Sequence, residues 1–274
     1  MGTPSTVPHH TPTYGSNEPS TSYTRPPPGY TGDQSPLMGT PRSSEDNIPD
    51  DFKYSTSVSE ATIDIRHAFV RKVYAILTVQ LITTAIFSSI SFFNDSFKTW
   101  IQTSTWMIFV AIFGSFAFLG LTFWKRHSYP MNLIFLSGFT LVEAYTVAVV
   151  TSFYDSKLVL EAVIITGLLF FGLTLFAVQT KYDFSSWYSY LYGALWLVLI
   201  FGFVSIFFPH DGWVELAYSG AVALLFSAYI LFDTQMIMRR MHVEEEIAAA
   251  IALYLDIINL FLAILRILNS TSDN

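Results

Sequence analysis

Two aspartates, Asp233 and Asp256, each lie inside one of the last two strongly apolar stretches of the chain. A carboxylate in a hydrocarbon environment costs several kcal/mol of free energy unless it is paired or hydrated. Carboxylates inside membranes usually mark the paths of ions or protons, so these two residues form the first candidate functional site. The alternative is structural: each aspartate would hydrogen-bond a polar neighbour such as Gln235 or Asn259, or a backbone carbonyl.

The two aspartates are expected at similar depth, because a short hairpin joins their segments. At about 1.5 Å of rise per residue, Asp233 lies about 9 Å before the polar pair Arg239-Arg240. Asp256 lies about 14 Å after the last segment starts near Ile247. Two carboxylates in contact cannot both ionise cheaply, so we expect the pair to share one proton and to titrate as a unit. Such a pair would respond to pH.

A further acidic residue, Glu143, lies near the middle of the third apolar segment. It either joins a cavity or hydrogen-bonds a neighbouring helix, and the sequence leaves both interpretations open. Glu161 and Glu215 lie near segment ends, where water solvates them. The run 244–246 is most simply a solvated helix start that the helix dipole favours, although three glutamates could also gather cations at a cytosolic mouth.

Composition places the chain in the membrane class. Of its 274 residues 52% are hydrophobic and only 13% are charged, whereas about 25% are charged in ordinary soluble domains. The chain has no cysteine, which excludes disulfides, a thiolate nucleophile and a cysteine metal site. No basic patch suggests nucleic acid as a partner. We therefore predict an all-α polytopic membrane protein whose main partner is the lipid bilayer.

The aspartates must be positioned by membrane helices, and seven apolar segments can be recognised. Each is close to the length of about 20 residues that spans about 30 Å of hydrocarbon. The sequence predicts a seven-helix membrane domain over residues 61–274, with spans at 72–93, 105–124, 131–152, 158–178, 187–208, 213–236 and 247–268. In an alternative with six spans, the last segment is re-entrant, and in either arrangement Asp256 requires that segment to be buried at the bundle centre.

Orientation follows from the lysines and arginines between the spans. The opposite loops hold only Lys98 and Lys157, whereas the side of the N-terminus collects Arg66, Arg71, Lys72, Lys125, Arg126, Lys181, Arg239 and Arg240. Because positively charged loops stay in the cytosol, the N-terminus is predicted to be cytosolic. Seven spans then place the C-terminus on the other side of the membrane.

Residues 1–60 form a separate region with ten of the twelve prolines in its first 50 positions. Such a composition buries too little apolar surface to offset the entropy of ordering, so we predict a disordered cytosolic tail. Within it, Pro27-Pro28-Gly29-Tyr30 matches the PPxY pattern, in which a polyproline II segment docks on an aromatic groove and the tyrosine fills a neighbouring pocket. The predicted partner is a WW-domain ubiquitin ligase.

The chain resembles the Bax-inhibitor family of seven-helix membrane proteins, in its lifeguard-like branch. The resemblance covers residues 60–269 and rests on four stretches: Arg66 to Leu81 in the first span, Tyr129-Pro-Met-Asn-Leu133 with Glu143, Tyr229-Ile-Leu-Phe-Asp-Thr-Gln235, and Leu253-Tyr-Leu-Asp-Ile-Ile-Asn-Leu-Phe-Leu262. The last of these motifs is highly specific.

The resemblance implies a pH-sensitive calcium leak across an intracellular membrane. The family's pH sensor falls on Asp233 and Asp256, which would bind Ca²⁺ transiently and not with high affinity. A basic latch residue at the cytosolic end of the second span falls on Arg126, with the adjacent Lys125 as the alternative. The resemblance also implies calcium homeostasis, a role in the endoplasmic-reticulum stress response, suppression of cell death and cell-death regulators as partners. The endoplasmic reticulum is the expected location, with vacuole or lysosome, Golgi and mitochondria as alternatives.

Other classes can be weighed against the same aspartates. An intramembrane aspartyl protease also uses two aspartates that share a proton, but its Gly-x-Gly-Asp motif is absent, since Leu253-Tyr254-Leu255 precedes Asp256. A seven-helix receptor would carry Asp-Arg-Tyr and Asn-Pro-x-x-Tyr signals, which are also missing. A proton-coupled calcium exchanger remains, because a titrating carboxyl pair suits coupling as well as gating. We expect no enzyme activity and no cofactor beyond the transported or sensed Ca²⁺ and H⁺.

Overall fold

The computed structural model describes residues 57–58, 61–126, 128–208 and 212–272. The PPxY residues Pro27, Pro28 and Tyr30, with nearly all of the region 1–60, lie outside the described residues. The proposed separation of tail and membrane domain at residue 60 therefore stays a prediction.

The described chain is helical, and seven of its helices are long and apolar enough to cross a membrane. This confirms the predicted all-α membrane fold. In chain order the elements are α2 (Ile63–Phe93), α3 (Asp95–Thr103), α4 (Thr105–Trp124), α5 (Met131–Thr151), α6 (Ser156–Gln179), η1 (Phe184–Trp187), α7 (Tyr188–Ser205), α8 (Gly212–Arg239) and α9 (Glu246–Ser272).

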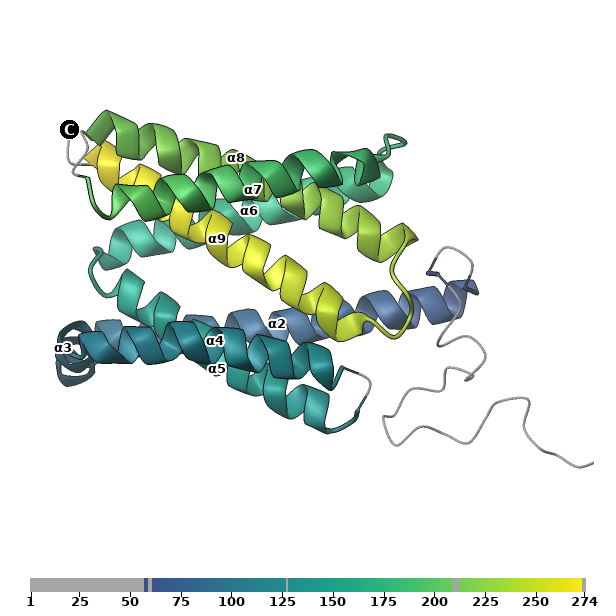
Figure 1. Ribbon diagram of the computed structural model, residues 1–274, viewed down its shortest axis with the longest axis horizontal. Helices are drawn as coiled ribbons and strands as arrows, with labels where there is room; N and C mark the ends of the chain where they lie inside the picture. Colours follow the sequence, from purple (N-terminus) through teal and green to yellow (C-terminus); the bar gives the residue numbers. More distant parts are fainter. Residues whose placement is uncertain (1–56, 59–60, 127, 209–211, 273–274) are drawn as a thin grey trace, which may run out of the picture. The chain divides into compact units, whose positions relative to one another are not determined.

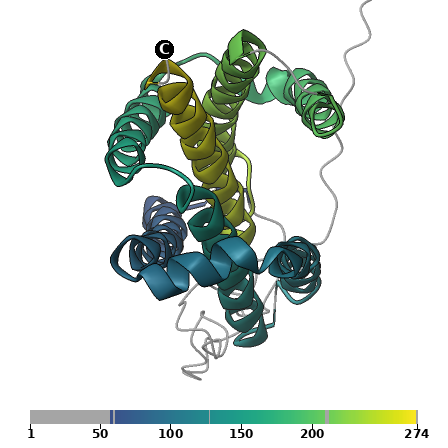
Figure 2. The same cartoon turned by 90° about the vertical axis from the view of Figure 1, so that its left-hand side faces the viewer.

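Helix α9 lies at the centre of the bundle, with α2, α4 and α5 on one side and α6, α7 and α8 on the other (Figures 1 and 2). Of its most apolar window 72% is buried inside the protein, against 11% for α4 and 6% for η1–α7. A lipid-facing helix can be apolar all round, whereas a helix with a carboxylate must turn that group away from lipid. The central position of α9 is what shields Asp256.

The observed helices differ from the predicted spans most clearly in two places. Helix α2 begins at Ile63 rather than at residue 72, because a helix continues past the apolar stretch that hydropathy detects. The short helix α3 was not predicted; Asn94 caps it by accepting a hydrogen bond from the backbone N–H of Phe97 at 3.0 Å. Helix α9 is unbroken from Glu246 to Ser272 and is long and apolar enough to cross a membrane, as seven spans require, and the six-span alternative stays a prediction.

Candidate functional site

Helices α8 and α9 pack against each other and bring Asp233 and Asp256 together. The two carboxyl groups interact directly with each other. Asp256 is only 5% exposed, and its Oδ2 atom accepts no hydrogen bond from any donor in the described part of the chain. Among the described residues, the observed ion pairs involve neither aspartate. The arrangement is thus a carboxyl–carboxyl contact inside the bundle that forms no ion pair with a base among the described residues.

In the structural alternative, each aspartate hydrogen-bonds a polar neighbour such as Asn259 or Gln235. Both of these amides form hydrogen bonds to backbone groups instead. The Asn259 amide donates to the carbonyl of Leu255 on its own helix at 2.8 Å. Gln235 bonds to the segment that joins α6 to η1. Among the described residues, neither amide is observed to hydrogen-bond an aspartate.

Tyr229 belongs to the same site, although the sequence alone did not predict it as a site residue. It lies one helical turn before Asp233, and both Asp256 and Asp233 act on its hydroxyl electrostatically. The spacing of four residues, which places two side chains on one helix face, is the sequence signal that could have found it. A tyrosine hydroxyl can donate a hydrogen bond to a nearby carboxylate.

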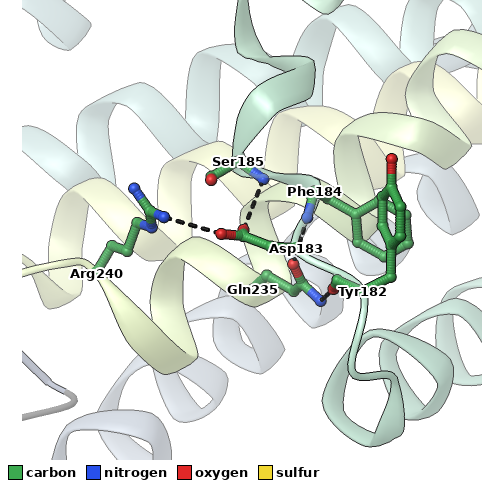
Figure 3. A network of polar contacts seen from close by, with 6 residues as sticks. All are labelled: Tyr182, Asp183, Phe184, Ser185, Gln235 and Arg240. Atoms are coloured by element: carbon green, nitrogen blue, oxygen red, sulfur yellow. Dashed lines mark hydrogen bonds and ion pairs between the residues drawn. The ribbon is translucent and has the colours of Figure 1, made fainter.

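On the opposite face of α8, Gln235 forms a fully bonded clamp on the segment before η1 (Figure 3). Its Oε1 accepts from the backbone N–H of Phe184 at 2.9 Å, and its Nε2 donates to the carbonyls of Tyr182 at 2.8 Å and Ala177 at 3.3 Å. Arg239 adds a bond to the Thr180 carbonyl at 3.0 Å. We call these contacts the Gln235 clamp.

Asp183 extends the Gln235 clamp into solvent. Its carboxylate accepts from the backbone N–H of Ser185 at 3.0 Å and pairs with Arg240 at 3.0 Å (Figure 3). The hydrogen bonds from Ser185, followed by the charge of Arg240, hold the pKa of Asp183 below its usual range. This carboxylate is therefore ionised wherever the protein is folded at ordinary pH.

The two candidate latch residues have different surroundings. Arg126 Nη1 lies 3.4 Å from Glu245 Oε1 in the loop before α9, and its own carbonyl accepts from the Asn132 amide at 3.0 Å. Lys125 instead lies over the Trp124 ring, 4.8 Å from its centroid. Arg126 thus links the α4–α5 loop to the α8–α9 loop, with Glu245 and not the aspartate pair as its partner. Its role as a latch stays a prediction.

Glu143 on α5 is half-buried and interacts with the Ser115 side chain of α4. It also acts electrostatically on the Tyr254 hydroxyl of α9. Within the described ranges no cluster of three or more His, Cys, Asp or Glu could hold a metal ion. Any calcium at Asp233 and Asp256 would have to use two carboxyl groups.

Comparison with known protein families gives one clear match. Residues 66–273 match the family described as "Inhibitor of apoptosis-promoting Bax1". Mouse protein lifeguard 4 is 41% identical over 234 residues, which cover 85% of this chain and 97% of the relative. Bax inhibitor 1 of Schizosaccharomyces pombe is 40% identical over 232 residues, covering 85% and 87%. The Golgi anti-apoptotic protein of vaccinia virus (strain Lister) is 40% identical over 222 residues, covering 81% and 93%.

Proposed function

Since the chain belongs to the Bax-inhibitor family of membrane proteins, we propose that it is a pH-sensitive calcium leak channel, gated by Asp233 and Asp256. The observation that carries the proposal is the contact between the buried carboxyl group of Asp256 and the partly buried one of Asp233, which form no ion pair among the described residues. A channel of this kind needs a group that changes charge inside the bundle, and this pair is the best placed to do so.

The gating argument follows from the charge of the pair. With one proton between them, the two carboxyl groups can share a hydrogen bond and the pair carries a single negative charge. Loss of that proton leaves two negative charges in contact within a low dielectric, which weakens the packing of α8 on α9. Because α9 is the central helix, a shift at this contact reaches the helices on both sides of the bundle.

The chemistry of the pair also suits calcium. Ca²⁺ prefers carboxylate and other oxygen ligands. A site with only two carboxyl groups binds weakly, and weak binding allows an ion to leave as readily as it enters. We therefore propose transient contact with Ca²⁺ and not a storage site, and we assign the pair no catalytic role.

The names of the relatives support a cellular role. The vaccinia relative is named a Golgi anti-apoptotic protein and the fission-yeast relative a Bax inhibitor. We propose that this protein suppresses cell death from the membranes of the endoplasmic reticulum and Golgi, with its N-terminus in the cytosol. Calcium homeostasis and the response to endoplasmic-reticulum stress would connect the leak to that outcome.

The test is calcium flux through the purified full-length chain in liposomes that contain a calcium dye. A leak channel should pass Ca²⁺ down its own gradient, at a rate that changes with pH, and should not concentrate Ca²⁺ when only a pH gradient is imposed. Uphill calcium movement driven by the pH gradient would identify the second candidate, a proton-coupled exchanger, which the titratable pair also suits. Absence of any calcium movement would contradict both.

A further inference from the structure

The buried face of α2 changes its chemistry halfway along the helix. Residues that recur at intervals of three and four lie on one helix face. On this face the half nearer the N-terminal tail is apolar, with Phe69, Val73 and Leu77, and the other half is polar, with Gln80, Thr84, Ser88 and Ser91. The polar side chains are 1% to 8% exposed. We call these four residues and the side chains that face them the α2 polar seam.

Two hydrogen bonds hold the polar seam to its neighbours. Thr84 Oγ1 lies 2.8 Å from the hydroxyl of Tyr254 on α9. Gln80 Nε2 donates to Thr140 Oγ1 on α5 at 3.1 Å, while the Thr140 hydroxyl itself donates to the Leu136 carbonyl at 2.9 Å. Because the Thr140 hydroxyl already donates its proton to the Leu136 carbonyl, it can only accept from Gln80, so the Gln80 amide must turn its N–H toward Thr140. The orientation of its Oε1 atom is thereby fixed.

Two oxygen atoms of the polar seam have no hydrogen-bond partner in the described part of the chain. They are Gln80 Oε1 and Ser88 Oγ, from side chains that are 2% and 8% exposed. The Tyr145 hydroxyl of α5 is in the same condition. Leaving buried polar groups unsatisfied costs about 1–3 kcal/mol each, so a ligand or water is expected to fill these positions.

One acidic residue, Glu143, lies near the seam, through its interaction with Tyr254. It lies one helical turn after Thr140 on α5, interacts with Ser115 of α4 and acts electrostatically on Tyr254. The available ligands are thus oxygens around one carboxylate, the donor chemistry that suits a hard divalent cation. One carboxylate is too few for tight binding, which fits an ion in transit.

Building on the proposed calcium leak, we propose that the α2 polar seam is the half of the ion path that lies opposite the N-terminal tail. It holds a partly hydrated divalent cation on amide, hydroxyl and carboxylate oxygens. Phe69, Val73 and Leu77 form the closed apolar barrier in the other half. Such a constriction excludes ions because it does not hold water.

Helix α9 connects this path to the carboxyl pair. Tyr254 and Asp256 are two residues apart, so they point to opposite sides of the helix. Tyr254 bonds to Thr84 in the seam, and Asp256 contacts Asp233 on α8. Movement of α9 at the aspartates would therefore pull on the seam through Tyr254.

The native chain has no cysteine, so the labelling of a single introduced cysteine can be measured without labelling of native thiols. Ser88→Cys places a thiol in the seam. Ser89→Cys is the matched control, because Ser89 is exposed on the outer face of α2, and its hydroxyl donates to the Ala85 carbonyl of its own helix at 2.7 Å. Leu77→Cys probes the barrier. Each full-length variant is placed in liposomes and treated on both faces with a membrane-impermeant cationic methanethiosulfonate.

Thiolate is the reacting form and needs water, so Ser88→Cys should be labelled at least about tenfold faster than Ser89→Cys and Leu77→Cys. Calcium ions should slow the labelling of Ser88→Cys, and adding Glu143→Gln should remove that protection. Equal rates at positions 88 and 89, or no reaction at 88, would overturn the aqueous seam. Labelling that Ca²⁺ does not slow would overturn the cation site. These readouts need no flux, so failure of the leak in liposomes is distinguishable from failure of the seam.

Discussion

Two polar sites on α8 lie only two residues apart and are built in opposite ways. Gln235 faces the segment before η1, and its amide oxygen and nitrogen are both hydrogen-bonded to backbone groups. Asp233 faces α9 and meets another carboxyl group, whose Oδ2 atom receives no donor from the described residues. The first site is complete without any added species, whereas the second needs a proton to be stable.

The difference contrasts a polar contact that fixes the position of a helix with a polar contact that could change its charge. Polar groups whose hydrogen bonds are all satisfied in a low dielectric fix one arrangement of the helices, because breaking those hydrogen bonds leaves buried polar groups without partners. An unsatisfied acidic pair has a second state close by in free energy. Helix α8 is thus hydrogen-bonded to the α6–η1 segment on one face, and its other face carries the carboxyl pair that would respond to pH under the proposed function.

Loss of the Gln235 clamp should have the largest effect on stability. Gln235→Leu leaves the Phe184 N–H and the carbonyls of Tyr182 and Ala177 without their partner, at a cost of about 3 kcal/mol in the free energy of unfolding. The measurement is thermal unfolding in detergent. Asn259→Ala is the control, since its amide bonds only its own helix. Equal unfolding temperatures for Gln235→Leu and the wild type would mean that the clamp does not hold α8.

Removing charge from the aspartate pair should change pH dependence more than stability. Asn imitates the protonated acid in shape but cannot ionise, so Asp233→Asn and Asp256→Asn should each flatten the dependence of calcium flux on pH. Folding and insertion should be normal. If both variants keep the pH dependence of the wild type, the sensor lies elsewhere, with Glu143 as the next residue to test.

The ion pair between Arg126 and Glu245 should have a smaller effect. Both side chains are partly exposed, and such pairs contribute at most about 1 kcal/mol, so Arg126→Ala should raise the leak by no more than about fivefold. Lys125→Ala is the matched control, because it removes the same charge from the neighbouring position. A larger increase with Lys125→Ala would transfer the latch role to that residue.

Asp183 should give no pH response in the range where the aspartate pair responds. Its pKa is lowered in the folded protein, so its contribution to stability is complete above the unfolded pKa of about 4 and is lost only as pH falls below that value. The difference in unfolding temperature between Asp183→Asn and the wild type should stay constant from about pH 8 to pH 5. A difference that shrinks within this interval would make the clamp part of the sensor.

The least effect on the bundle is expected from Tyr30→Ala in the tail. The substitution removes the aromatic anchor of the PPxY motif, so a peptide of residues 20–35 should lose its binding to WW domains. Calcium leak through the full-length variant should match that of the wild type. Wild-type peptide that binds no WW domain in a broad panel would refute the partner.

The sequence was sufficient for features that depend on the local chain. Hydropathy predicted seven spans because about 20 apolar residues are needed to cross the membrane. The intervals that placed Asp233 and Asp256 at one depth follow from the constant rise of a helix. Asp256 also predicted the burial of α9, because a carboxylate excludes that helix face from lipid.

Features that depend on the partner of a side chain could not be read in this way. The clamp was missed because Gln235 binds backbone groups of Ala177, Tyr182 and Phe184, and every residue offers such groups. Helix α3 was missed because it is short and mixed in polarity. The polar face of α2 was present in the spacing of Gln80, Thr84, Ser88 and Ser91, but only packing against α5 and α9 distinguishes it from a face turned to lipid.

The shared proton is the central claim, and infrared difference spectroscopy of the full-length protein tests it most directly. In the upper of the pair's two titration steps, the carbonyl stretch of a protonated carboxyl group should change with the amplitude of one group, because that step releases the one shared proton. In both Asp233→Asn and Asp256→Asn the band should shift in frequency and in titration midpoint, because the remaining carboxyl group has lost its carboxyl partner. A band that persists unchanged in both variants, or the absence of any titrating carboxyl band, would contradict the account.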